Sequence, residues 1–314
     1  MNPRLMMRTP TLAPFLLATL FLAAAPLEAQ GRRGDGDVRQ RIDTTFAFDR
    51  GGEVDLSLVS GEIIVTGGAS NQIRIVATTE RGRLVTSFGR THVSIEARSV
   101  NDRLGETRYE LTVPRGTRVT AHAVSGDIRV HGTGAAVEVH SVSGDISVRD
   151  ASDRLEVGTV SGDLTVARAS GRLQFESVSG DMMAEELTGD LTIETISGEM
   201  TLRRSTLAGI RASSMSGDLE YDGPFSPTGT YRFNSHSGNV EFGLPANAGA
   251  TLQLETFSGR IASDFPLTLQ PGQTAGRRNR RMEFTLGTGG TRISAETFSG
   301  NITIRRLPAR GNQE

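Results

Sequence analysis

A Ser-Gly-acid triad that recurs at eighteen-residue steps constrains the fold of this 314-residue chain more than any other feature. A fixed spacing of this kind indicates one structural unit repeated along the chain, and such units are stable only when neighbours stack and bury a shared core. The steps lengthen to 19, 21, 21 and 41 residues toward the C-terminus. The triads are Ser60-Gly61-Glu62, Ser125-Gly126-Asp127, Ser143-Gly144-Asp145, Ser161-Gly162-Asp163, Ser179-Gly180-Asp181, Ser197-Gly198-Glu199, Ser216-Gly217-Asp218, Ser237-Gly238-Asn239, Ser258-Gly259-Arg260 and Ser299-Gly300-Asn301.

Each eighteen-residue unit divides into two halves of nine residues, because Gly171 and Gly189 each fall nine residues after a triad glycine. When the glycine is counted as position one, apolar residues occupy positions three, five and eight. Positions three and five alternate with polar residues, which is the period of a β-strand. We therefore expect these three positions to point into the core. Examples are Val137, Val139, Val142, Leu155, Val157, Val160, Leu173, Phe175, Val178, Leu191, Ile193 and Ile196.

The glycines predict the turns between strands, because glycine adopts positive φ without a Cβ clash and the flanking Ser and Asp side chains hydrogen-bond turn amides. The fold class that follows is all-β: a two-sheet β-solenoid of 18-residue coils, preceded by an irregular β-strand segment. Gly158, which falls mid-strand and outward in this register, is expected to accept a side chain. The predicted structural turns are at Gly126, Gly144, Gly162, Gly180, Gly198 and Gly217.

The N-terminus has the pattern of a secretory signal, with Arg4 and Arg8 followed by an apolar stretch over residues 11–25. We therefore expect an exported protein, either in the periplasm or at the cell surface and outside the cell, with no integral membrane span after signal removal. The expected segments are a signal peptide (1–29), a disordered linker (30–44), an N-terminal β-strand region (45–120), a β-solenoid (121–306, regular over 121–220 and looser over 221–306) and a flexible tail (307–314).

The charge of the chain is close to balance, with 34 basic and 36 acidic residues. Without residues 1–29, which carry two Arg and one Glu, the counts become 32 and 35, a net charge of −3. This gives no general attraction to nucleic acid, so we expect no nucleic-acid partner. The one dense basic patch is an expected anion-binding loop, with a solvated insertion as its alternative. It consists of Arg277, Arg278, Arg280 and Arg281.

Two polar series recur along the repeats and have competing interpretations. Asp127, Asp145, Asp163 and Asp181 would stack along one edge, where they either cap turns or hold calcium. No other metal and no cofactor is expected. The second series consists of hydroxyl residues at position seven, which either form turns or present a regular array to sugars or ice. Its members are Ser141, Thr159, Ser177, Thr195, Ser214, Ser235, Thr256 and Thr297.

The residue types needed for catalysis are not found in a recognisable pattern. The chain has no Cys, and its five His residues show no metal-ligand spacing. There is no nucleophile elbow and no phosphate-binding loop. We therefore predict no catalytic residues and a protein that is not an enzyme.

The Ser-Gly-Asp-apolar-x-apolar repeats, preceded by Val113-Pro114-Arg115-Gly116, resemble a bacterial family of unknown function classed as candidate adhesins. The resemblance covers most of residues 46–306 and implies an envelope or surface β-repeat protein without catalytic residues. The function expected is adhesin-like binding of a surface polysaccharide or an envelope protein. The alternatives are a structural scaffold that self-associates, and a periplasmic module that senses envelope stress.

Overall fold

The computed structural model describes residues 39–100, 105–269 and 281–307. The chain divides into two compact units, residues 1–35 and 36–314, and all described residues lie in the second. They form strands and connecting turns, with no helix among them that could cross a membrane. The expected signal peptide (1–29) and all but the first residue of the expected tail (307–314) lie outside the described residues.

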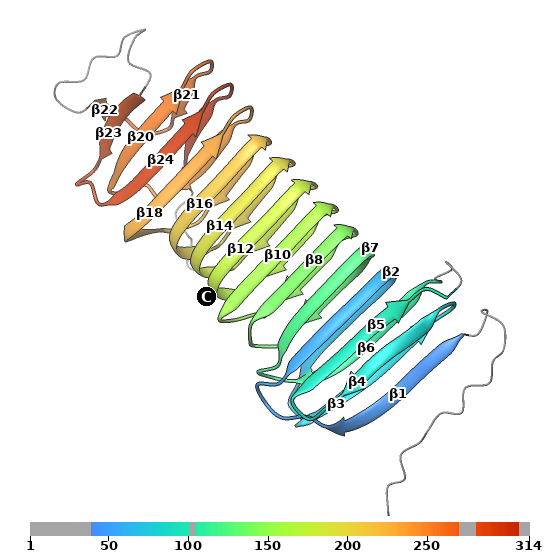
Figure 1. Cartoon of the computed structure of the whole chain (residues 1–314). Helices are drawn as coiled ribbons and strands as arrows, with labels where there is room; N and C mark the ends of the chain where they lie inside the picture. The colour runs from blue at the N-terminus through green and yellow to red at the C-terminus, as the bar shows by residue number, and fades with distance from the viewer. Residues whose placement is uncertain (1–38, 101–104, 270–280, 308–314) are drawn as a thin grey trace, which may run out of the picture. The chain divides into compact units, whose positions relative to one another are not determined.

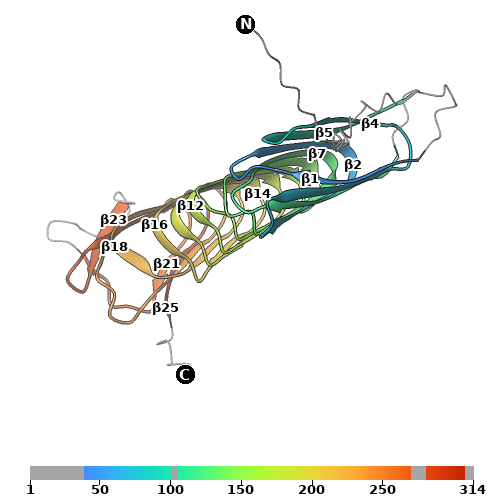
Figure 2. The ribbon, with the colours of Figure 1, turned by 90° about the horizontal axis from the view of Figure 1, so that it is seen from below.

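The strands form coils that stack in one direction, each coil adding one strand to each of two sheets (Figure 1, Figure 2). Between residues 118 and 244, neighbouring coils pair in parallel, and residues lie beside their equivalents in the next coil except at register shifts after Gly189 and Leu207. This confirms the all-β, two-sheet solenoid predicted from the eighteen-residue repeat.

Sheet 1 carries the longer strands of each coil. In stacking order its strands are β4 (Arg83–Phe88), β5 (His92–Arg98), the first half of β2 (Glu53–Gly68), the first half of β7 (Arg118–His131), β8 (Val137–Ser143), β10 (Arg154–Ser161), β12 (Ser170–Ser179), β14 (Thr188–Ser197), β16 (Thr206–Ser216), β18 (Phe225–Ser235), β24 (Thr291–Thr297), β20 (Ala250–Thr256), β23 (Arg281–Leu286) and β22 (Thr268–Leu269).

Sheet 2 carries the shorter strands, and β2 and β7 run round the corner to join it to sheet 1. In stacking order its strands are β1 (Gln40–Ala47), β3 (Gln72–Thr79), β6 (Thr107–Pro114), the second halves of β2 and β7, β9 (Ile146–Arg149), β11 (Leu164–Ala167), β13 (Met182–Glu185), β15 (Met200–Arg203), β17 (Leu219–Asp222), β19 (Val240–Leu244), β25 (Ile302–Arg306) and β21 (Ile261–Ser263).

At both ends of the stack, the coils do not follow the order of the chain. The coil of β24 and β25 lies between the β18–β19 coil and the β20–β21 coil, although it comes last in sequence. In the same way β2 lies between β7 and the later strands β5 and β6. Antiparallel strands close both sheets at the N-terminal end and sheet 1 at the C-terminal end, whereas sheet 2 ends there on β21, which pairs with β25 in parallel.

Two of the expected segment boundaries need correction. β1 begins at Gln40, so a paired strand occupies residues 40–44 of the expected linker (30–44). The boundary expected at residue 120 falls inside β7, and β2 pairs with β7 along both of its halves. The stacked coils therefore begin well before residue 121.

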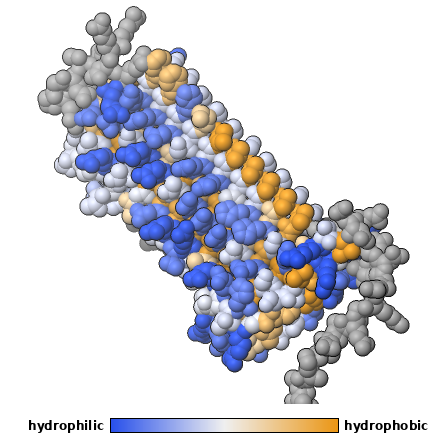
Figure 3. All heavy atoms as spheres, viewed as in Figure 1, coloured by the Kyte–Doolittle hydropathy of each residue, from blue (hydrophilic) through white to orange (hydrophobic). Residues whose placement is uncertain are grey.

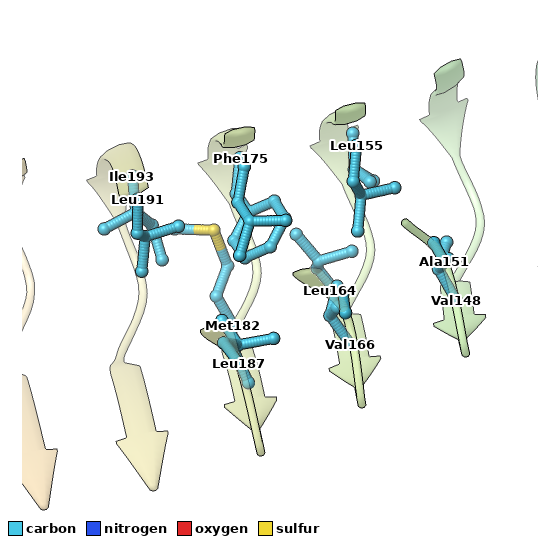
Figure 4. Close-up of a cluster of buried hydrophobic side chains, with 14 of the residues drawn as sticks. Val148, Ala151, Leu155, Leu164, Val166, Phe175, Met182, Leu187, Leu191 and Ile193 are labelled. Carbon is cyan, nitrogen blue, oxygen red and sulfur yellow. The ribbon is translucent and has the colours of Figure 1, made fainter. Parts of the chain in front are cut away.

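Positions three and five form the core, as expected: Leu155, Val157, Leu173 and Phe175 are all buried. Whether the position-eight side chain is buried depends on which half of the coil contains it. In the half that follows the Ser-Gly-Asp turn, this position is buried at Ala151 and Leu187 (Figure 4). It is buried at Ala169 as well. In the other half it is exposed, which corrects the assignment of Val142, Val160, Val178 and Ile196 to the core.

The two corners of the coil explain this difference. Before the buried position-eight residues, the chain takes a left-handed conformation at Asp150, Arg168, Glu186 and Arg204, with φ of 50–56°. This kink folds the next side chain inward. At the other corner strand alternation continues, so that position seven points inward and position eight points outward.

Candidate functional site

The Asp residues of the Ser-Gly-Asp turns lie one above another and connect neighbouring coils through backbone amides. The amide of Asp163 donates to Asp145 Oδ1 at 2.9 Å, and the amide of Asp181 donates to Asp163 Oδ1 at 3.0 Å. Asp127 accepts in the same way from the next coil at 3.1 Å. The series continues with amide side chains, because the amide of Asn301 donates to Asn239 Oδ1 at 3.0 Å. This geometry favours turn capping as the role of the Asp series.

One group of side chains in the described residues has donor atoms close enough together to hold a metal ion, and it does not include the Asp series. It consists of Glu138, His140 and Glu156, whose ligand atoms lie within 4.8 Å of one another. Glu138 and Glu156 are equivalent residues of neighbouring coils, while the His140 ring stacks on His122 at 5.5 Å. Sequence reasoning missed this group because it considered the Asp series and the spacing of His residues separately and did not combine a His with Glu residues of neighbouring coils. The Glu-to-Glu step of eighteen residues was the available signal.

The turn glycines are packed against one another. A Cβ on Gly162 would lie 2.3 Å from the carbonyl oxygen of Gly144, and one on Gly126 would lie 2.4 Å from that of Gly61. Positive φ is found at Gly144, Gly162, Gly180 and Gly198, but not at Gly126 or Gly217. The close approach of neighbouring coils therefore explains why glycine is needed at all six turns. Positive φ explains it at only four of them.

Gly158 can accept the expected side chain only if the part-exposed His140 side chain moves aside. A Cβ at this position would lie 2.6 Å from Nδ1 of His140, whose ring covers the glycine.

The position-seven hydroxyls lie inside the corner of the coil, where they are not presented as a surface array. Ser141, Thr159 and Ser177 are only 4–6% exposed. Ser141 donates to the carbonyl oxygen of Gly126 at 3.3 Å, and Thr297 donates to that of Gly238 at 3.1 Å. Of the two interpretations of this series, the observed contacts favour turn formation.

Only Arg281 of the four arginines of the expected anion-binding loop is described. It is the first residue of β23, and its guanidinium donates to Glu255 at 3.0 Å and to Glu296 at 2.7 Å. Its charge is therefore already paired with these two glutamates of neighbouring strands. Arg281 for this reason does not act as part of the expected anion-binding loop. Arg277, Arg278 and Arg280 lie outside the described residues.

The most distinctive surface feature is a row of exposed apolar side chains, which we call the apolar ladder. It consists of the position-eight residue of ten successive coils, one residue per coil, and forms a line along the edge where the strands of sheet 1 end (Figure 3). Nine of the ten rungs are apolar, with exposed fractions between 41% and 54%. In stacking order the rungs are Val59, Val124, Val142, Val160, Val178, Ile196, Met215, His236, Phe298 and Phe257.

A shallow groove of about 990 Å³ runs beside the apolar ladder across the central coils. The rungs from Val142 to Met215 form one side, and the outward residues two positions earlier form the other. The latter include His140, Glu176 and Glu194. At the far end of the ladder the aromatic rungs stack on one another, with Phe257 and Phe298 ring centroids 4.6 Å apart.

Acidic residues flank the central part of the ladder, on the sheet 1 side only beside Val178 and Ile196. Glu176 and Glu194 pair in neighbouring strands on the sheet 1 side. Asp145, Asp163 and Asp181 lie on the other side, each three residues after a ladder rung. Within the described part of the chain, none of these five carboxylates forms an ion pair with an arginine. The central ladder is therefore an apolar line with three Asp carboxylates along one side and two Glu carboxylates on the other, where His140 and Gly158 lie beside Val142 and Val160.

Comparisons with solved structures found distant likenesses that span most of this chain. A candidate adhesin from Bacteroides fragilis is 12% identical, with a TM-score of 0.42, over 87% of this chain and 100% of that chain. A candidate lipid binding protein from Parabacteroides distasonis is 10% identical, with a TM-score of 0.35, over 85% of this chain and 97% of that chain. A search among curated proteins returned no match.

A family model gives the assignment that these distant likenesses do not. The model described as Toastrack DUF4097 matches residues 32–228 and 135–305, which together span most of the chain. The matched residues include the stacked Ser-Gly turns, the capping Asp series and all ten rungs of the apolar ladder. The family expected from the Ser-Gly-Asp repeats is thus confirmed, and the chain belongs to the Toastrack DUF4097 family.

Proposed function

We propose that this protein is an exported, non-catalytic component of the cell envelope that binds an envelope partner through the apolar ladder. The interior of the coils is filled by apolar side chains, so a ligand can bind only on the outer surface. The observation that carries the proposal is the repetition of an apolar residue at the same exposed position in nine of ten coils. Contiguous apolar surface of this kind is typical of interaction sites.

An envelope protein suits the ladder better than a polysaccharide. Carbohydrate surfaces use exposed aromatic faces, whereas the central rungs are aliphatic. The aromatic rungs Phe257 and Phe298 turn their faces toward each other. Ladder and groove together offer a narrow apolar line with polar margins, which resembles the apolar core and polar rim of protein interfaces.

The proposal can be tested by co-sedimentation of the full chain with isolated bacterial envelopes. In the V142T/V160T/V178T variant, Thr keeps the β-branched shape and replaces exposed methyl groups by hydroxyls. We expect this variant to lose most of its binding while its melting temperature stays close to that of the wild type. V85T is the matched control, because Val85 is 36% exposed away from the ladder. Equal binding by all three proteins would refute the proposal.

A self-assembling scaffold is the second candidate, because two ladders share the same spacing and so match each other rung for rung. Sedimentation velocity over a range of concentrations separates the two functions. A mass that rises with concentration in the wild type, but not in V142T/V160T/V178T, would identify self-assembly.

A further inference from the structure

The charges beside the apolar ladder restrict the chemistry of whatever binds there. Glu176 and Glu194 lie on one side, and Asp145, Asp163 and Asp181 on the other. A ligand that covers the rungs from Val142 to Ile196 would run beside the Asp row and would have Glu176 and Glu194 on its other side at Val178 and Ile196. Charge complementarity then favours a partner that is apolar along one line and positively charged on its flanks.

The carboxylates of the Asp row remain available to such a partner although they cap turns. In Asp145 and Asp163 one oxygen, Oδ1, accepts the amide of the next coil. Both side chains are exposed, and the second oxygen, Oδ2, has no hydrogen bond within the described residues. The negative charge is therefore held in a fixed position by the backbone and still faces solvent.

We propose that the apolar ladder and its groove bind a cationic amphipathic polypeptide in an extended conformation. The inference rests on the proposed function and names the partner class for the same surface. The groove runs along the stack between the rungs and the residues two positions earlier, so a single chain segment fits it better than a broad surface would. At about 4.8 Å per coil, the five rungs from Val142 to Met215 span about 19 Å, a length that six or so extended residues cover.

The same charges disfavour the other occupants. A second copy of this chain would bring its own acidic rows against these, in either orientation of the two stacks. An anionic lipid surface or an acidic polysaccharide would meet the same repulsion. A neutral polysaccharide would gain nothing from the charged rows. These occupants are outcomes that the experiment below separates.

The test measures binding of three synthetic peptides of equal length to the full chain by calorimetry. One alternates leucine with lysine, one leucine with glutamate, and one serine with lysine. We expect the leucine–lysine peptide to bind at least about tenfold more tightly than either of the others, the order expected when a few exposed charge pairs or the apolar contact are lost. Its affinity should also fall as salt is raised, because exposed charges are screened.

A charge variant of the protein provides the second arm. D145N/D163N/D181N removes three carboxylates and keeps the capping oxygen, since Asn239 already caps the next coil in this way. We expect it to fold normally and to bind the leucine–lysine peptide about tenfold more weakly, with a smaller salt dependence. The matched control E110Q/E185Q/E186Q removes three carboxylates away from the ladder, of which Glu110 and Glu186 are exposed and Glu185 is half-buried, and it should bind like the wild type.

The outcomes separate the inference from the proposed function. Equal affinity for the leucine–lysine and leucine–glutamate peptides, or equal binding by D145N/D163N/D181N and its control, would overturn the cationic partner. The ladder itself would remain a binding surface if V142T/V160T/V178T still lost envelope binding. Binding of the serine–lysine peptide as tight as that of leucine–lysine would refute both, because the apolar rungs would then contribute nothing. Preference for a neutral dextran over all three peptides would also overturn the inference.

Discussion

At the central turns, each glycine lies against the carbonyl oxygen of the glycine in the neighbouring coil. The distance from a Cβ on Gly162 or Gly180 to that oxygen would be 2.2–2.3 Å, which no real side chain tolerates. The glycine therefore sets how closely two coils approach. Its positive φ, where present, is a second and smaller requirement.

Gly162→Ala and Gly134→Ala separate these two effects. Both glycines have positive φ, but a Cβ on Gly134 meets nothing within 4 Å. We expect Gly134→Ala to lower the free energy of unfolding by the ~1–2 kcal/mol of a left-handed L-residue. Gly162→Ala should cost clearly more, because the backbone of neighbouring coils must also move. Chemical denaturation of both variants provides the measurement, and equal losses would show that close packing is not the main constraint.

Asp150 predicts a dependence of stability on pH. Arg168 donates to its carboxylate at 2.6 Å and thereby lowers the pKa of Asp150, against a smaller opposing effect of burial. A depressed folded pKa stabilises the fold above the unfolded pKa, and this stabilisation is lost as the pH falls through the folded pKa. Asp150→Asn, which tolerates the left-handed backbone, should cost ~0.2–1 kcal/mol at neutral pH.

The difference between wild type and Asp150→Asn should then shrink as the pH falls below about 4, where the carboxyl begins to protonate. Melting curves across this range measure it. A difference that stays constant with pH would show that the ion pair does not contribute.

At the scale of the strand and its turn, hydropathy alone could place positions three and five but not position eight. Both halves of the repeat carry an apolar residue there, Val160 in one and Ala169 in the other, and the sequence pattern treats them alike. The distinction comes from backbone conformation. A residue in the left-handed conformation, Arg168, precedes the buried Ala169. An Arg residue in the sequence gives no indication of positive φ. The hydroxyl at Thr159 was the available signal, since a strand that continues its alternation from Val157 turns Thr159 inward and Val160 outward.

Val157→Asp and Val160→Asp test this alternation within one strand. Val157 is 1% exposed and Val160 is 43% exposed. Asp at position 157 buries an unpaired carboxylate and should cost several kcal/mol or raise its own pKa. Asp at position 160 should change the melting temperature little. If the two variants melt alike, the exposed position of the ladder is wrong.

On the scale of the whole molecule, the eighteen-residue step predicted the stack but not the order of its end coils. From the sequence, the long step from Ser258 to Ser299 predicts only a looser part of the solenoid. In the structure the coil that contains Ser299 is inserted between two earlier coils. Repeat spacing cannot reveal this, because both orders place the same residue types beside one another. The order of the coils is decided by the parallel pairing of β24 with both β18 and β20.

Disulfide formation can verify the inserted coil, because the chain has no native cysteine. Arg232 and Ser294 are paired neighbours in β18 and β24. Gln253 is paired with Ser294 from the other side, so Arg232 and Gln253 are two strands apart. We expect R232C/S294C to oxidise readily and R232C/Q253C to remain reduced, since two strand spacings of ~4.8 Å exceed the Cα reach of a disulfide. The reverse result would show that the coils stack in chain order.

The most direct measurement of the central claim is maleimide labelling of single cysteines along the apolar ladder, free and with the leucine–lysine peptide bound. V142C, V160C, V178C and I196C should all label rapidly in the folded protein, whereas V157C in the core should label only on unfolding. Bound peptide should slow labelling at all four rungs together and leave M183C, exposed on sheet 2, unaffected. Slow labelling of the free rungs would contradict the exposed ladder, and rungs that label equally fast with and without peptide would contradict its role as the binding surface.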